Sequence, residues 1–173
     1  MTMKLVIGDI TTLTVDAIVN AANKTLLGGG GVDGAIHRAA GKGLFDECCK
    51  LGGCEPGQAK ITGSYNIAGV KAIIHTVGPI YKGKSADAQT LRNCYINSLN
   101  LAKENGLHSI AFPSISTGYY GYPLLEAAEI SVKAVTDWQA ENENYPMDVI
   151  FCCFHQGGYH VYQNVMNQNG GNV

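Results

Sequence analysis

Basic residues are scarce in this sequence. Its 173 residues contain 12 lysines and arginines against 14 aspartates and glutamates, which gives a net charge of −2. Proteins that hold DNA or RNA by its phosphates present a basic surface, and this composition cannot supply one. We therefore expect no nucleic-acid partner, and any phosphate that binds has to be held mainly by backbone dipoles.

Long apolar runs are also missing, and so is any cysteine spacing that is typical of a disulfide framework or a zinc site. No run approaches the length of a signal sequence or a membrane span. The six cysteines include the adjacent pairs Cys48-Cys49 and Cys152-Cys153, and no C-x-x-C occurs. We expect reduced thiols, no bound metal, no membrane partner and a cytoplasmic location.

The sequence shows no linker, internal repeat or block of like charges. A chain of this length is long enough to bury about two thirds of its unfolded surface in one core. We therefore expect a single domain over residues 1–173, with a frayed Asn- and Gly-rich end at 167–173.

Two glycine-rich loops are the most informative features that are present. Four successive glycines at 28–31 lead directly into a helical pattern, an arrangement that brings bare backbone N–H groups close to an anion. A second loop, at 113–123, is rich in Ser, Thr and Gly and also connects an apolar strand to a helix. Two such loops in one small domain suggest a diphosphate ligand.

Short apolar, β-branched runs alternate with helical patterns along the chain. The predicted strands are 3–8, 16–21, 61–67, 71–77, 109–114 and 147–154, and the predicted helices are 33–40, 44–51, 86–105 and 123–140. Asp33 is the expected N-cap of the first helix, and Gly41 its end. Alternation predicts a mostly parallel sheet covered on both faces, and a tight turn at Ala68-Gly69 makes that sheet mixed.

Five segments together resemble the macrodomain family, and within it the MacroD-type ADP-ribose hydrolases. They are residues 8–11, 15–23, 27–41, 73–79 and 110–123. The resemblance implies a three-layer α/β/α sandwich with a six-stranded mixed β-sheet and an ADP-ribose cleft at the C-terminal strand ends. It also implies a hydrolase that releases ADP-ribose from O-acetyl-ADP-ribose and from mono-ADP-ribose esterified to Asp or Glu side chains. ADP-ribose, its esters and ADP-ribosylated proteins would be its partners, and no cofactor would be needed.

The resemblance also assigns catalytic roles. Asp33 would orient or deprotonate the attacking water, His37 would support that end of the site, and Asn23 would hydrogen-bond the distal ribose. A carboxylate close to a bound diphosphate ionises less readily, which raises its pKa and makes it a better general base. Asn20 follows a buried run and is expected instead to close a turn with its own backbone.

Further residues would bind ADP-ribose according to the same resemblance. They are Asp9, Ile10 and Phe154 at adenine, and Gly30, Gly31, Val32, Ser116, Thr117, Gly118, Tyr119 and Tyr120 around the diphosphate and distal ribose. Two of them have local alternatives, since Asp9 can cap the turn that follows it and Phe154 can pack in the core. Tyr119 replaces a small β-branched residue that is more usual in this loop, and its ring would narrow the cleft.

Two other functions must be weighed. A non-catalytic module that reads ADP-ribose marks would need every binding residue, and only Asp33, His37 and Asn23 favour the enzyme. The pattern G-x-G-x-x-G, which begins at Gly29, suggests a nicotinamide-dependent Rossmann enzyme. In Rossmann enzymes, however, the first glycine of this motif directly follows a strand. Here seven residues separate Asn20 from Gly28, so the Rossmann interpretation is disfavoured.

Overall fold

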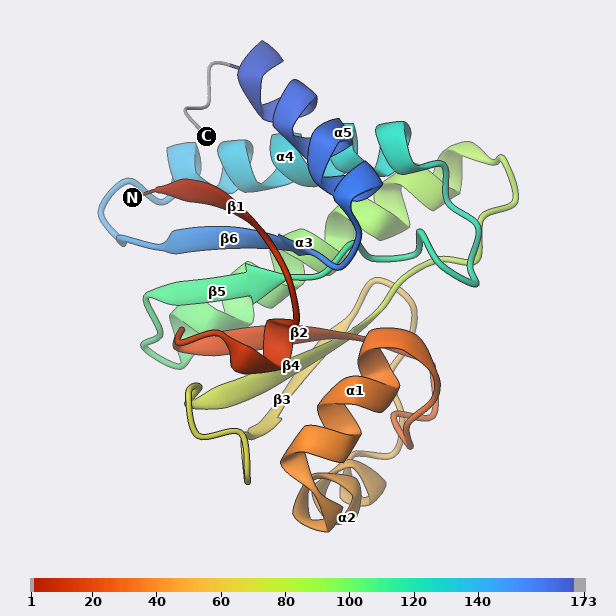
Figure 1. Ribbon diagram of the computed structural model, residues 1–173, viewed down its shortest axis with the longest axis vertical. Helices are drawn as coiled ribbons and strands as arrows, with labels where there is room; N and C mark the ends of the chain where they lie inside the picture. The colour runs from red at the N-terminus through yellow and green to blue at the C-terminus, as the bar shows by residue number, and fades with distance from the viewer. Residues whose placement is uncertain (1, 170–173) are drawn as a thin grey trace.

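The computed structural model describes residues 2–169, and its centre is one six-stranded sheet (Figure 1). The strands are β1 (Met3–Ile7), β2 (Ala17–Ala22), β3 (Ala59–Gly63), β4 (Ala72–Val77), β5 (Ser109–Phe112) and β6 (Asp148–Cys153), in the spatial order β1-β6-β5-β2-β4-β3. Neighbouring strands are parallel except for β3, which runs antiparallel to β4 at one edge. The prediction of a mixed sheet with a turn at Ala68-Gly69 is confirmed.

Within residues 2–169, five α-helices and one short 3₁₀ helix flank this sheet. They are η1 (Ile10–Thr12), α1 (Gly31–Ala40), α2 (Lys42–Leu51), α3 (Ser85–Glu104), α4 (Leu124–Glu141) and α5 (Gln156–Gln168). Helices α1 and α2 cover one face, and α3, α4 and α5 cover the other (Figure 1). The expected three-layer α/β/α sandwich is therefore confirmed.

Strand β2 shows how the sequence builds two cores from one sheet. Successive side chains of a strand point to opposite faces. Accordingly Ala17 and Val19 pack in the core beneath α3 and α4, whereas Ile18 packs in the core beneath α1 and α2. All three are fully buried. A run that is apolar at every position is what a strand covered on both faces requires.

Most predicted element boundaries differ from the observed ones by one or two residues, and two of the differences have a clear local cause. Strand β3 ends at Gly63 instead of residue 67, because the chain turns at Tyr65, where φ is +49°. The N-cap of α1 is Gly30 and not Asp33, which lies inside the first helical turn with its side chain directed away from the helix backbone.

A further helix, α5, was not predicted. A frayed end was predicted for residues 167–173, but residues 167 and 168 belong to α5. Residues 170–173 lie outside the described residues. No helix in the described part of the chain is long and apolar enough to cross a membrane.

The topology also fixes where a crevice opens. Strands β2 and β5 are neighbours, yet β2 leads to α1 on one face and β5 leads to α4 on the other. Adjacent parallel strands whose connections leave in opposite directions separate at their carboxyl ends, and ligands of open α/β sheets bind there.

Candidate active site

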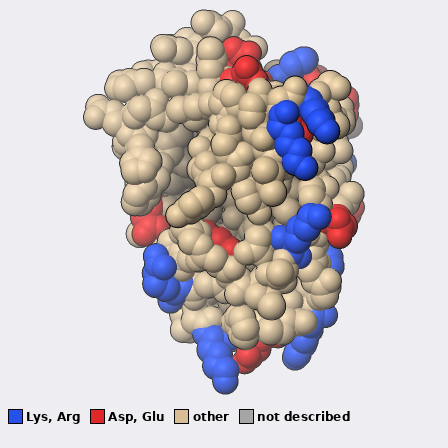
Figure 2. Space-filling view, turned by 90° about the vertical axis from the view of Figure 1, so that its right-hand side faces the viewer, with Lys and Arg blue, Asp and Glu red and all other residues tan. Residues whose placement is uncertain are grey.

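A cleft of about 860 Å³ lies at this edge of the sheet, within the roughly 300–1,000 Å³ range of small-molecule sites. Figure 2 shows that face of the molecule, hollowed near its middle and with acidic atoms visible inside. The predicted site residues that line the cleft are Asp9, Ile10, Asn23, Gly30, Gly31, Val32, Asp33, Ser116, Thr117, Gly118, Tyr119, Tyr120 and Phe154. His37 does not line it and lies behind Asp33.

The N-terminus of α1 forms one wall of the cleft. Gly31 begins the helix with φ at +59°, a conformation that costs glycine little. Within the described residues, the N–H groups of positions 31–33 have no backbone acceptor, and the first such bond runs from Gly34 to Gly30 at 3.3 Å. Free N–H groups and the positive end of the helix dipole make this wall suited to an anion.

The loop between β5 and α4 forms the opposite wall. Ser116 is held at a φ of +67°, and its Oγ donates to the carbonyl of Pro79 over 2.8 Å. Gly78 permits this approach, because a Cβ there would lie 2.1 Å from the Ser116 Oγ. The N–H groups of residues 116–120 donate to no acceptor within residues 2–169. The strained serine therefore belongs to a loop that lines the cleft with a row of free donors.

The two residues with local alternatives lie at the end of the cleft near β1 and β6. The Phe154 side chain is 74% exposed, so the core-packing alternative is wrong. Asp9 caps η1, accepting from the N–H of Thr11 over 2.9 Å and from its hydroxyl over 2.7 Å. Both bonds fall on Oδ1, which leaves Oδ2 available to a ligand in the cleft.

Asn23 also combines a local and a site role. Its Nδ2 donates to the carbonyl of Gly28 over 2.9 Å, and its Oδ1 accepts from the N–H and hydroxyl of Thr25. The side chain thus fixes the start of the glycine loop while lining the cleft. One N–H of its amide stays available to a ribose hydroxyl.

Asp33 is the buried carboxylate of the site, with 4% of its surface exposed. Burial raises its pKa above the ordinary value of 3.8, against smaller opposing effects of the Asn20 hydrogen bond and the nearby His37 ring. The Nε2 of His37 lies 3.4 Å from the Asp33 Oδ1. A carboxylate whose pKa is raised is a stronger base and better suited to accept a proton from water.

Two buried polar residues behind Asp33 were missed at the sequence level. Asn20 does not close a turn, as the sequence suggested, because it lies inside β2 with its side chain fully buried. Its Nδ2 donates to the Asp33 Oδ1 over 2.8 Å and lies 3.1 Å from Nδ1 of His75, its register partner in β4. His75 is also fully buried, and desolvation lowers its pKa to about 4, so the imidazole is neutral near pH 7.

The raised pKa of Asp33 predicts a stability cost. Between the unfolded and folded pKa values the folded state binds more protons, so the free energy of unfolding falls as pH rises. We expect Asp33→Asn to raise the melting temperature near neutral pH and to lose this gain below the ordinary carboxyl pKa of 3.8. Thermal melts across that pH range test this. Asp46→Asn, an exposed carboxylate on α2, is the control, and an equal gain from it would contradict the prediction.

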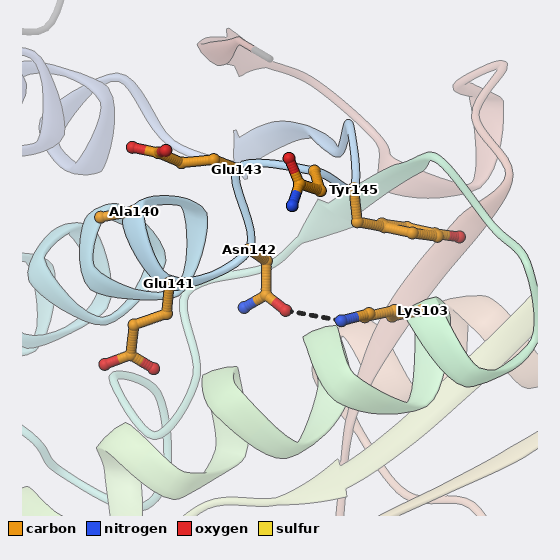
Figure 3. A pocket seen from close by; sticks show the side chains of 7 residues that line it. Lys103, Ala140, Glu141, Asn142, Glu143 and Tyr145 are labelled. Carbon is orange, nitrogen blue, oxygen red and sulfur yellow. Dashed lines mark hydrogen bonds between the residues drawn. The ribbon is translucent and has the colours of Figure 1, made fainter.

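A second hollow, of about 410 Å³, lies between the end of α3 and the segment after α4 (Figure 3). A hydrogen bond from Lys103 Nζ to Asn142 Oδ1 at 2.8 Å joins its two sides on an exposed surface. In the described part of the chain, no group of three or more His, Cys, Asp or Glu side chains is placed to hold a metal ion. The larger cleft is therefore the candidate site.

These features define an α/β protein whose facing backbone loops suit a diphosphate beside a buried carboxylate. The sequence model of the macro domain family matches residues 19–131. An Escherichia coli protein named O-acetyl-ADP-ribose deacetylase is 48% identical over 168 residues, which cover 94% of each chain. The chain belongs to the macro domain family.

Two other similarities support this assignment. A human protein named ADP-ribose glycohydrolase MACROD2 is 52% identical over 163 residues, which cover 93% of this chain and 38% of that protein. The Trypanosoma brucei macrodomain in complex with ADP-ribose superposes with a TM-score of 0.89 at 42% identity, covering 94% of this chain and 68% of that one. The chain therefore spans well under half of the human relative.

Proposed function

We propose that this protein hydrolyses O-acetyl-ADP-ribose, and mono-ADP-ribose esterified to Asp or Glu side chains, to free ADP-ribose without a metal ion. The observation that carries the proposal is the buried Asp33 carboxylate, held by Asn20 at the cleft floor beside two rows of free N–H donors. A module that only reads ADP-ribose has no use for a carboxylate close to the two negative phosphates. The names of the bacterial and human relatives support the same class of reaction.

The geometry suggests how the residues share the work. The donors of α1 and of the loop at 116–120 would hold the diphosphate, and Asn23 would fix the distal ribose. Asp33 would then accept a proton from a water molecule as that water attacks the ester. The bond between the acyl carbon and the ribose oxygen breaks, the acid is released, and the freed ribose oxygen takes up the proton that Asp33 accepted. Positioning and preorganised dipoles would supply most of the rate enhancement.

The direct test is mass-spectrometric turnover of O-acetyl-ADP-ribose by the purified protein, with a no-enzyme control for spontaneous ester loss. We expect release of ADP-ribose in proportion to enzyme, unchanged by EDTA. Intact substrate, with ADP-ribose still raising the melting temperature, would instead mean a reader module. Loss of activity in EDTA would contradict the metal-independent mechanism alone.

Phe154 should contribute to adenine binding. Its exposed ring lines the cleft near Asp9 and Ile10, and stacking of a base on an aromatic ring is worth about 1–3 kcal/mol. Phe154→Ala should therefore weaken ADP-ribose binding by roughly 5- to 150-fold in calorimetric titrations. Phe45→Ala, which removes an exposed ring from α2, is the matched control. Equal affinities of both variants would remove Phe154 from the adenine site.

A further inference from the structure

A chain of buried hydrogen bonds runs from β3 through β4 and β2 to Asp33. The Nδ2 of Asn20 lies 2.8 Å from the Asp33 Oδ1 and 3.1 Å from Nδ1 of His75, and the Nε2 of His75 lies 2.9 Å from the Thr62 Oγ1. All four residues are buried. Thr62 and His75 do not line the cleft, and this chain of hydrogen bonds connects them to Asp33 through Asn20.

The donors and acceptors available fix the direction of each bond. An amide nitrogen can only donate, so His75 accepts at Nδ1 and carries its single proton on Nε2. Thr62 accepts from that N–H and donates its own hydrogen to the carbonyl of Gly63 over 3.1 Å. Because desolvation keeps His75 neutral, only two tautomers compete, and the Thr62 hydroxyl favours the one with the proton on Nε2.

The tautomer of His75 with its proton on Nδ1 would have the opposite effect and would favour the protonated form of Asp33. With its proton on Nδ1, His75 would need an acceptor, and the Asn20 amide would turn its oxygen toward the ring. The same amide atom faces Asp33, so an oxygen would then meet the carboxylate. Two facing oxygens form a hydrogen bond only if one carries a proton, and a protonated Asp33 cannot accept a proton from water.

The orientation of the Asn20 amide in this series of hydrogen bonds is energetically costly. The Asn20 Oδ1 is buried and has no hydrogen-bond partner within the described residues, although the rest of β2 is apolar. A buried acceptor without a partner is unfavourable, so the amide gives up one bond in order to donate two. An apolar residue would pack here at lower cost if the position served the core alone.

Other titratable groups adjoin the chain from two helices. His37 on α1 lies 3.4 Å from Asp33, and Glu47 on α2 acts electrostatically on His75. Cys48 on α2 lies 3.9 Å from the His75 Nε2, and burial raises the pKa of its thiol to about 11. This protonated thiol can donate to Nε2 in the other tautomer, whereas the Thr62 oxygen, whose own hydrogen is used at the Gly63 carbonyl, favours the tautomer with the proton on Nε2.

We propose that Thr62 and His75 are positioning residues, which hold the amide nitrogen of Asn20 toward Asp33 and so keep Asp33 in the ionised form that hydrolysis needs. The consequence for catalysis rests on the function proposed above. The effect on the carboxyl group itself is independent of that function and can be measured without substrate.

The test is NMR of protein with labelled histidine and aspartate, with the Asp33 resonance assigned from Asp33→Asn. The wild-type protein should show His75 as the Nε2–H tautomer. Thr62→Val removes the acceptor oxygen with little change of shape, and should raise the Asp33 pKa by about one unit. Thr62→Ser keeps the hydroxyl and should restore the wild-type value. Thr76→Val is the matched control, since it removes a buried hydroxyl of β4 that donates to the Gln58 carbonyl and adjoins the Cys94 thiol, away from Asn20 and Asp33.

The pH dependence of turnover gives the second measurement. In Thr62→Val the acidic limb of the kcat profile should move upward with the Asp33 pKa, with KM unchanged, and Thr62→Ser should follow the wild type. A wild-type Nδ1–H tautomer, an unshifted Asp33 in Thr62→Val, or an equal shift in Thr76→Val would overturn the proposal. Absence of turnover in the wild-type protein would overturn the proposed function only, and the NMR titration would still decide the positioning role.

Discussion

Asp33→Ala should lower turnover of O-acetyl-ADP-ribose by about 10²–10⁴-fold, which is the contribution expected of a general base. ADP-ribose should bind the variant at least as tightly as the wild type. The diphosphate donors are backbone N–H groups that the substitution leaves in place, and the change removes a negative charge from beside the phosphates. Initial rates by mass spectrometry and affinities by calorimetry measure the two effects separately.

Asp46→Ala is the control for this experiment, because it removes an exposed carboxylate from α2. Its rate should equal that of the wild-type protein. Unchanged turnover in Asp33→Ala would take Asp33 out of the mechanism. A loss of ADP-ribose binding that matches the loss of rate would instead make Asp33 a binding residue.

The outline of the fold could be predicted because each strand has a recognisable local sequence pattern. A run such as Ala17–Ala22 is short and mostly apolar, and a glycine caps the C-terminus of α1 and of α2. The helix α5 was not predicted because residues of low helix propensity, Gly157 and Gly158, lie in its first turn, and its last turns contain several Asn and Gln residues. A helical spacing was nevertheless present in Tyr162, Val165 and Met166, the residues that α5 buries.

The cleft could be predicted only in part, for a related reason. Its two loops are continuous in sequence, so their glycine, serine and threonine content indicated anion binding directly. The partners of Asp33 are not continuous: Asn20 and His75 meet because β2 and β4 are paired in that register. Register depends on the whole sheet, and a single Asn or His within an apolar run does not reveal which residue it will face.

Gly34→Ala should damage ligand binding even though alanine usually stabilises a helix by about 0.5–1 kcal/mol relative to glycine. Gly34 lies inside α1, and a Cβ there would be 2.5 Å from the carbonyl oxygen of Gly29 and 3.0 Å from Nη1 of Arg38. The arginine can move aside, but a backbone carbonyl cannot move without its loop. Overpacking of this kind typically costs about 1–3 kcal/mol, so the melting temperature should fall.

The loop displacement should also reach the site. The Cα of Gly29 adjoins the side chains of Asp33 and Asn23, since a Cβ there would lie 3.2 Å from the first and 3.4 Å from the second. Pushing this loop away shifts the donors that follow it at the start of α1. A hydrogen bond to a charged group is worth about 1.5–3 kcal/mol, so loss of one such bond to the diphosphate should lower ADP-ribose affinity by about 10- to 100-fold.

Gly157→Ala is the matched control, because it makes the same substitution in α5 where a Cβ would meet nothing within 4 Å. Its melting temperature should equal or exceed that of the wild type, with ADP-ribose affinity unchanged in calorimetric titrations. If both variants bind like the wild type, the contact between Gly34 and Gly29 does not position the loop. If only Gly34→Ala loses affinity, the missing side chain at residue 34 is what allows α1 to present its free N–H groups to the cleft.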